Sequence, residues 1–202
     1  MLYAQAQDGG MIPCAFGLLS SKTKVLYKKF WSCVQEALGP AVYPETILMD
    51  MEQGAIRAFE EVFIRLQGEE EDREISIQFC LFHFQRAILD ELAKEKCKPE
   101  METNPLFNRI YNLVRRLPSV HYDHVRLVAN TFIHALLSGN EDGISDQAYQ
   151  WINYIKTYYT GYFDPGRNRW IKPRFHPKFW CVISIIAEQS HTNSHSCKRR
   201  KN

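Results

Sequence analysis

Short β-prone runs alternate with helical patterns in the first half of this chain, and that alternation most limits the folds open to it. Leu2 to Gln7 and Ile12 to Leu19 are apolar runs separated by Asp8-Gly9-Gly10, so we expect a β-hairpin with an Asp-Gly turn. A helical pattern follows from Lys22 to Leu38, and Gly39-Pro40 marks its end. The predicted buried face of this helix contains Val25, Leu26, Phe30, Cys33, Val34 and Ala37.

The alternation continues through two more strands, each followed by a helical pattern. Thr46 to Met49 and Ile75 to Phe79 are short apolar runs typical of strands. Between them, Met51 to Leu66 carries apolar residues at helical spacing, namely Ala55, Ala58, Phe59, Val62 and Phe63. The order of elements predicts an α/β fold in which several strands share a sheet covered by helices.

From His83 onward the pattern becomes helical throughout. Apolar residues recur at helical spacing in Phe84 to Lys96, Pro105 to Leu117, Val120 to Leu137 and Asp146 to Tyr159. Thr160 to Pro177 is rich in Gly, Pro, Arg and aromatic residues and is predicted to be a loop, and Lys178 to Ala187 is predicted to be a last short helix.

The composition is that of a globular protein, and 202 residues are enough for one domain with a helical insertion. The net charge of +2 neither demands nor excludes a partner that carries phosphate. Six cysteines lie far apart in the sequence, which suits a reducing compartment. The longest apolar stretches fall short of the roughly 20 residues that cross a bilayer, so we expect no membrane-spanning segment.

Asp50 stands at the end of a predicted strand and directly before a predicted helix. A carboxylate at such a corner is placed to bind a magnesium ion together with a substrate phosphate. The alternative is that Asp50 is the N-cap of the helix, with Glu52 adding favourable negative charge to its first turn. Local sequence leaves both interpretations open.

Four motifs occur in order along nearly the whole chain. They are Asp50-Met-Glu-Gln-Gly-Ala55, Cys80-Leu-Phe-His83-Phe-Gln-Arg86, Arg174-Phe-His-Pro-Lys-Phe-Trp180 and Thr192-Asn193. Together they resemble the catalytic domain of Mutator-like (MULE) DNA transposases. The resemblance implies a ribonuclease H-like α/β fold with an all-helical insertion. It also implies a DDE site, in which three carboxylates hold magnesium or manganese for DNA strand cleavage and transfer.

The resemblance assigns roles to individual residues of this sequence. Asp50 matches the second carboxylate and metal ligand, and Cys80 and His83 match the family's Cys-x2-His motif. The first two apolar runs look like the family's second and third strands, so the first strand and its aspartate are expected upstream of Met1. Cys197 stands about where the family has its glutamate, and Asp8 fits a hairpin turn better than a ligand. Only one of the three DDE carboxylates is thus identified.

Two other groups of residues suggest binding chemistry. Basic and aromatic residues interleave after residue 166, and the candidates for contacts to nucleic acid are Arg167, Arg169, Trp170, Lys172, Arg174 and Lys178. The alternative is a loop pinned to the helices by its aromatic side chains. Cys80 and His83 supply half of a zinc site, which Cys181, His191, His195 and Cys197 would have to complete. We expect no zinc, because the spacing of these residues repeats no known ligand pair.

We therefore predict an incomplete ribonuclease H-like core over residues 1–98, a helical insertion over 99–160, and a return segment with a basic tail over 161–202. The predicted function is that of a MULE-type transposase-derived domain, inactive as this fragment. The alternative is a domesticated module that binds DNA or protein without catalysis. By resemblance, the partners are transposon-end DNA and further copies of the chain, and the location is the nucleus.

Overall fold

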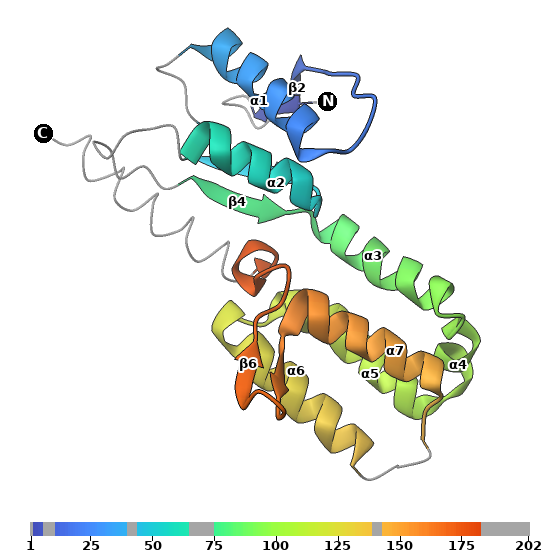
Figure 1. Ribbon diagram of the computed structural model, residues 1–202. Helices are drawn as coiled ribbons and strands as arrows, with labels where there is room; N and C mark the ends of the chain where they lie inside the picture. Colours follow the sequence, from blue (N-terminus) through green and yellow to red (C-terminus); the bar gives the residue numbers. More distant parts are fainter. Residues whose placement is uncertain (1, 6–10, 40–43, 65–74, 139–142, 183–202) are drawn as a thin grey trace, which may run out of the picture. The chain divides into compact units, whose positions relative to one another are not determined.

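A computed structural model describes residues 2–5, 11–39, 44–64, 75–138 and 143–182 of the chain. The chain divides into two compact units, Met1–Ile77 and Gln78–Asn202, and each is described here by itself. The fold is mixed α/β, as predicted at that level (Figure 1). The finer division into residues 1–98, 99–160 and 161–202 stays a prediction.

The first unit begins with the predicted hairpin. Strands β1 (Leu2–Gln5) and β2 (Met11–Ala15) pair antiparallel, with Gln5 opposite Met11. The second strand ends four residues earlier than predicted because its last residue, Ala15, already pairs with the first residue of β1, Leu2. The predicted turn at Asp8-Gly9-Gly10 lies outside the described residues.

Two helical segments build the core of the first unit. Helix α1 (Lys24–Leu38) is capped by Thr23 and ends at Gly39, whose φ is +78°. Helix α2 (Gln53–Phe59) continues into the π-helical turn η1 (Glu60–Ile64). The ring of Trp31 lies edge-on to Phe59 and Phe63, at centroid distances of 5.2 and 6.0 Å. These rings hold α1 against α2 and η1.

The strands of the first unit form two pairs and not the single larger sheet that we predicted. Strand β3 (Thr46–Met49) pairs with β4 (Ser76–Phe79), whose second half belongs to the second unit. The backbone N–H of Ser76 donates to the carbonyl of Glu45 at 2.9 Å. No described strand pairs with both β3 and the β1–β2 hairpin, so the two pairs remain separate sheets.

The second unit is a helical assembly, and the four helices predicted between Phe84 and Tyr159 are confirmed. Its helices are α3 (Leu81–Lys94), α4 (Lys98–Thr103), α5 (Pro105–Arg116), α6 (Tyr122–Leu137) and α7 (Asp146–Ile155). Short helical turns are η2 (Leu117–Ser119), η3 (Lys156–Thr160) and η4 (Pro177–Phe179). The Trp151 side chain is fully buried, packs edge-on against Phe107 at 5.5 Å, and donates to the carbonyl of Ile88 at 2.9 Å. These contacts link α3, α5 and α7 (Figure 1).

A second hairpin lies where we predicted a loop. Strands β5 (Tyr162–Asp164) and β6 (Arg169–Ile171) pair antiparallel, and Phe163 stands opposite Trp170. The Asp164 carboxylate accepts from the backbone N–H groups of Gly166 and Arg167, which closes the turn. Each strand has only three residues, so the turn residues between them dominated the sequence pattern and hid the strands.

The remaining expectations concern the end of the chain and the membrane. Residues 177–179 form the short turn η4, where we predicted the start of a helix from Lys178 to Ala187, and residues 183–187, the second half of that helix, lie outside the described residues. Among the residues that the structure describes, no helix has the length and apolar character needed to cross a bilayer.

Candidate functional site

Asp50 occupies the corner between β3 and α2. Its Oδ1 accepts the backbone N–H of Met51 at 2.8 Å, and its carbonyl accepts the N–H of Glu52 at 2.8 Å. The N-cap of α2 is Glu52, so the alternative interpretation of Asp50 as the N-cap is wrong. Asp50 is exposed at the surface, and the strand before it is only half buried, with Leu48 64% exposed.

A second carboxylate and a phenol accompany Asp50. The pKa of Tyr27 on α1 is raised, first by burial and then by the negative charges of Glu52 and Asp50. Gly54 permits this approach, because a Cβ at that position would lie 3.3 Å from the Tyr27 ring. The sequence pattern did not identify Tyr27, because its link to the corner depends on how α1 packs against α2.

The donor set at this corner suits a hard cation in chemical type. Magnesium is commonly held by one or two carboxylates, with water and substrate phosphate completing the shell. In the described ranges, no three His, Cys, Asp or Glu side chains gather into a metal-binding group. Asp50 and Glu52 are the two carboxylates whose charges act on Tyr27 at this corner.

Cys80 and His83 lie at the start of α3, in the second unit. Cys80 is the N-cap residue but makes no side-chain capping bond, and His83 is exposed in the first turn with its ring 5.7 Å from that of Phe82. The helix thus begins before His83, at Leu81. Asp50 belongs to the first unit, whereas Cys80 and His83 belong to the second.

The candidate zinc ligands divide between a buried thiol and residues that are not described. Cys181 is fully buried, and burial raises the pKa of its thiol to about 12. Zinc binds the thiolate, so this environment favours the form that does not bind the metal. His191, His195 and Cys197 lie outside the described residues.

The interleaved basic and aromatic stretch has two different parts. In its first part, the exposed rings of Trp170 and Phe163 meet edge-on at 5.5 Å, with exposed fractions of 46% and 43%. In its second part, Phe175 and Trp180 are buried, and Trp180 donates to the Phe175 carbonyl at 3.2 Å. The stretch thus has an exposed ring in its first part and buried rings, which pin the chain, in its second part.

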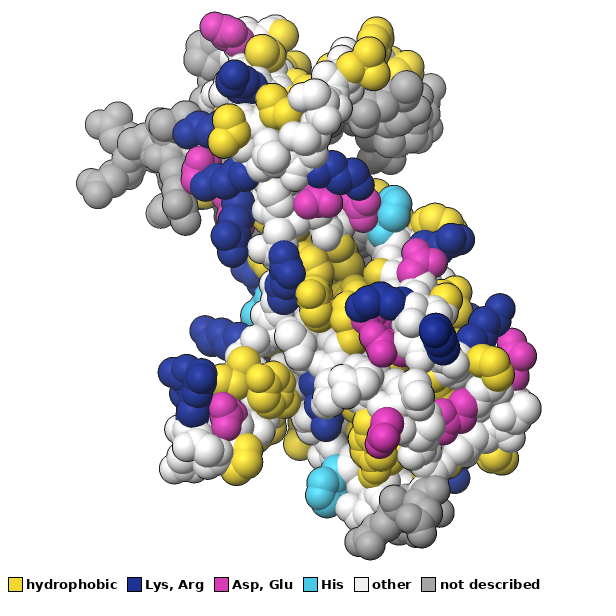
Figure 2. Space-filling model, turned by 45° about the vertical axis from the view of Figure 1, so that its right-hand side comes forward, with side chains coloured by type: hydrophobic (Ala, Val, Ile, Leu, Met, Phe, Trp, Pro, Cys, Tyr) yellow, Lys and Arg dark blue, Asp and Glu magenta, His cyan; other side chains and the backbone are white. Residues whose placement is uncertain are grey.

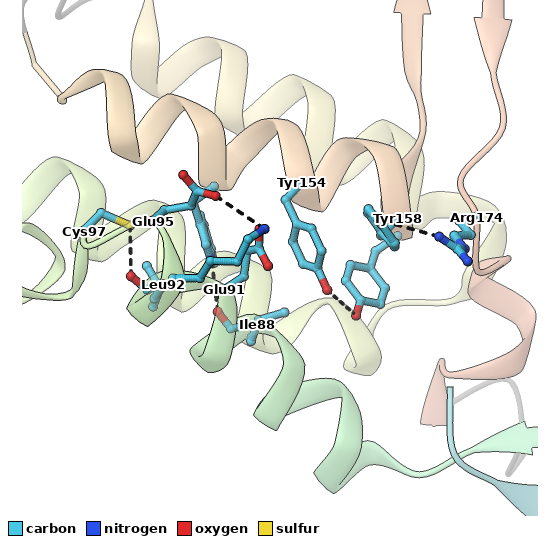
Figure 3. A network of polar contacts seen from close by, with 11 residues as sticks. Ile88, Glu91, Leu92, Glu95, Cys97, Tyr154, Tyr158 and Arg174 are labelled. Carbon is cyan, nitrogen blue, oxygen red and sulfur yellow. Dashed lines mark hydrogen bonds and ion pairs between the residues drawn. The ribbon is translucent and has the colours of Figure 1, made fainter. Parts of the chain in front are cut away.

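The candidate basic residues have distinct local partners. Arg169 is the first residue of β6, and Arg167 lies in the turn before it. Arg167 Nε is 3.6 Å from Asp164 Oδ2. Arg174 donates to the Tyr158 hydroxyl at 3.4 Å, as Figure 3 shows for these two side chains. Lys172 is exposed, and the Lys178 ammonium lies 4.9 Å from the Phe179 ring centroid.

Arg126 adds a contact that the sequence pattern did not reveal. Its guanidinium carbon lies over the Trp170 ring, 4.6 Å from the centroid, and both side chains are exposed. Arg126 is on α6, far from Trp170 in the sequence, so no local spacing could have linked the two. The pair combines a cation with an exposed aromatic face.

A hollow of about 450 Å³ opens beside this pair, between α6, the turn η3 and the hairpin. Its lining residues are Asn130, Ile133, His134, Leu137, Ser138, Lys156, Tyr162, Phe163 and Trp170. Burial lowers the pKa of Lys156, and this ammonium pairs with no carboxylate of the described residues.

His176 lies in the motif that contributes to the family resemblance. Its Nδ1 accepts the N–H of Lys178 at 3.2 Å and caps η4. The pKa of His176 is lowered by partial burial and by the charges of Lys178 and Lys172, while Asp123 acts in the opposite direction. The ring is therefore held toward its neutral form.

Basic and acidic side chains are mixed on the face that Figure 2 shows. Figure 2 shows basic side chains beside hydrophobic ones at several places, with acidic groups among them. No single sign of charge covers the face in view, which agrees with the small net charge of +2. Attraction of a polyanion would therefore depend on local groups such as those around Trp170.

Comparisons of the chain with models of protein families, with curated proteins and with solved structures find no match. The resemblance to a family therefore rests on the motifs within the chain itself.

Proposed function

We propose that this chain is a nucleic-acid-binding domain of MULE-type transposase origin, with a ribonuclease H-like core. Its ancestral chemistry would be magnesium- or manganese-dependent DNA strand cleavage and transfer. The observation that carries the binding function is the exposed Arg126–Trp170 pair, which lies beside the ring of Phe163 on the β5–β6 hairpin.

The chemistry of this pair suits nucleic acid. Arginine and lysine neutralise phosphates, and exposed rings stack on unpaired bases whatever the sequence. Arg169 and Lys172 lie at and just after β6 and extend the positive charge around Trp170. By resemblance, the ligand would be transposon-end DNA, and binding would take place in the nucleus and involve more than one copy of the chain.

The order of elements supports the ribonuclease H-like part of the proposal. Hairpin, helix, strand, helix, strand, helix is the order that the resemblance implies after the family's first strand. Two separate strand pairs are also compatible with a larger sheet whose central strand comes from outside the described residues. Such a strand would supply hydrogen-bond partners to both pairs.

The Asp50 corner supports the ancestral chemistry but not independent catalysis. A two-metal reaction needs several carboxylates that hold ions about 3.5–4 Å apart. The corner offers Asp50 and Glu52, and the second of these has no counterpart in the three-carboxylate DDE set as assigned above. We therefore expect the chain to bind DNA and to leave it uncut.

Binding to a fluorescent duplex, followed by anisotropy over a range of salt concentrations, tests the proposal. We expect affinity to fall as salt rises, because counterions are released from the phosphates. Arg126→Ala should lower the salt slope by about one and weaken binding, since one phosphate contact is lost. Arg109→Ala is the matched control, because Arg109 is exposed on α5 and does not contact Trp170.

Two outcomes would contradict the proposal. The first is an affinity that does not depend on salt, or equal losses in the Arg126 and Arg109 variants. The second concerns catalysis. If the purified chain nicks or joins transposon-end DNA with magnesium or manganese, and Asp50→Ala abolishes this, the chain is an active enzyme.

A further inference from the structure

The hollow beside the hairpin has the composition of a site for a ring that carries an anion. Its volume of about 450 Å³ falls within the range of small-ligand sites. Tyr162, Phe163 and Trp170 supply aromatic walls, and Lys156 supplies a cation. Aromatic walls favour flat rings, and an ammonium favours an anionic group.

Lys156 is the lining residue that most favours an anionic ligand in the hollow. The side chain is partly buried, and burial alone lowers its pKa. A partly buried ammonium without an acidic partner destabilises the folded chain, because it has lost water and gained no counter-charge. A ligand anion beside Lys156 would supply that counter-charge.

The polar groups of the hollow suit the edge of a base. The amide nitrogen of Asn130 donates to the Arg126 carbonyl at 2.8 Å, and its Oδ1 makes no hydrogen bond with a described residue. His134 Nδ1 lies 3.0 Å from Ser138 Oγ. An amide and an imidazole at the wall can donate to and accept from the polar edge of a heterocyclic base.

From this geometry we infer that the hollow binds a single nucleotide, with its base against Trp170 and Phe163 and its phosphate at Lys156. This inference rests on the proposed function where the nucleotide is an unpaired residue of a DNA strand. The same chemistry is offered by a free nucleoside monophosphate, and the experiment separates the two sources.

Three probes are measured with the whole chain at one salt concentration. They are a fully paired duplex, the same duplex with one unpaired 2-aminopurine, and deoxyadenosine monophosphate. We expect the duplex with the unpaired base to bind about tenfold more tightly than the paired one, since one stacked base contributes about that much. The 2-aminopurine fluorescence should fall severalfold on binding.

Two variants locate the effect. Lys156→Met keeps an unbranched apolar stem and removes the ammonium. It should remove most of the tenfold preference while changing paired-duplex affinity less than twofold. Lys98→Met is the matched control, because Lys98 is exposed on α4 and does not line the hollow. It should leave the preference unchanged. Circular dichroism of each variant verifies that it folds.

The outcomes keep this inference distinct from the proposed function. Salt-dependent binding of the paired duplex with no preference for the unpaired base overturns the nucleotide site and leaves the proposed function standing. Binding of the monophosphate alone, lost in Lys156→Met, supports the site with a free nucleotide and counts against the proposed function. Binding of none of the three probes overturns both.

Discussion

Gly161 joins the turn η3 to strand β5, and replacing it with alanine should destabilise the second unit. Its φ is +73° and its ψ is 174°, a conformation that is essentially confined to glycine and costs another L-residue about 1–3 kcal/mol. An added Cβ would also lie 2.6 Å from the carbonyl oxygen of Ile171 and 3.1 Å from Pro173. The backbone must shift to relieve the first contact, so we expect a total loss of about 2–4 kcal/mol.

Two other glycines separate the two contributions to this loss. Gly39 has a φ of +78° and a ψ of 167°, with nothing within 4 Å of an added Cβ, so Gly39→Ala should cost only the backbone contribution of about 1–3 kcal/mol. In the same hairpin as Gly161, Gly166 would place a Cβ in ordinary contact, 3.4 Å from Asp164 Oδ1, and Gly166→Ala should change stability by less than about 0.5 kcal/mol.

Urea unfolding followed by circular dichroism measures these differences. Asparagine provides a further test, because it is favoured over alanine only in the αL conformation, and the ψ values of 167° at Gly39 and 174° at Gly161 lie far from that region. Gly39→Asn should therefore be as damaging as Gly39→Ala, and Gly161→Asn as damaging as Gly161→Ala. Equal stability of the Gly161→Ala and Gly166→Ala variants would refute this account of the hairpin.

Three further predictions concern pH, capping and thiols. The pKa of His176 is lowered in the folded chain, so the free energy of unfolding should decrease as pH falls from 6.5 toward that folded pKa. Urea unfolding curves at a series of pH values measure this dependence. The variant His176→Asn, which keeps an acceptor for the cap, should flatten it. The Glu100 carboxylate accepts hydrogen bonds from the backbone N–H and the hydroxyl of Ser145, which is the N-cap of α7. Glu100→Ala should therefore lower the free energy of unfolding by about 2 kcal/mol. Glu102 is exposed, so the control variant Glu102→Ala should change it little. Iodoacetamide should modify the exposed thiols of Cys14 and Cys33 quickly, as measured by mass spectrometry. Cys97 and Cys181 should react only on unfolding, because burial raises the pKa of the Cys97 thiol to about 11 and that of the Cys181 thiol to about 12. Rapid labelling of Cys181 in the folded chain would contradict its placement in the core.

Periodicity predicted the elements better than it predicted their faces. Helices α3, α5, α6 and α7 of the second unit follow from apolar residues at helical spacing, and the structure confirms them, whereas the six-residue helix α4 was not predicted. In α1, however, the buried residues are Trp31 and Val34, whereas Val25, predicted to be buried, is 65% exposed. The Trp31 indole of α1 packs against Phe59 and Phe63. Which face of α1 is buried therefore depends on α2 and η1, and the apolar pattern of α1 alone contains no information about them.

The candidate site was predictable only where its residues are close in sequence. The position of Asp50 after a strand and before a helix follows from local patterns, and the structure places it there. The contact of Arg126 with Trp170 and the hollow with Lys156 bring together α6, η3 and β6. Their meeting depends on tertiary packing and on a hairpin whose strands are too short to leave a periodic signal.

The unequal exposure of the tryptophans also makes the chain its own optical reporter. Of the four indoles in the sequence, Trp31, Trp151 and Trp180 are buried, and Trp170 alone stands in solvent. A neutral collisional quencher such as acrylamide should therefore quench the red-shifted fluorescence of Trp170 and leave the emission of the three buried indoles largely unchanged. Any event at the hairpin can be followed in this way without attaching a dye, because the other three indoles supply an internal reference within the same molecule.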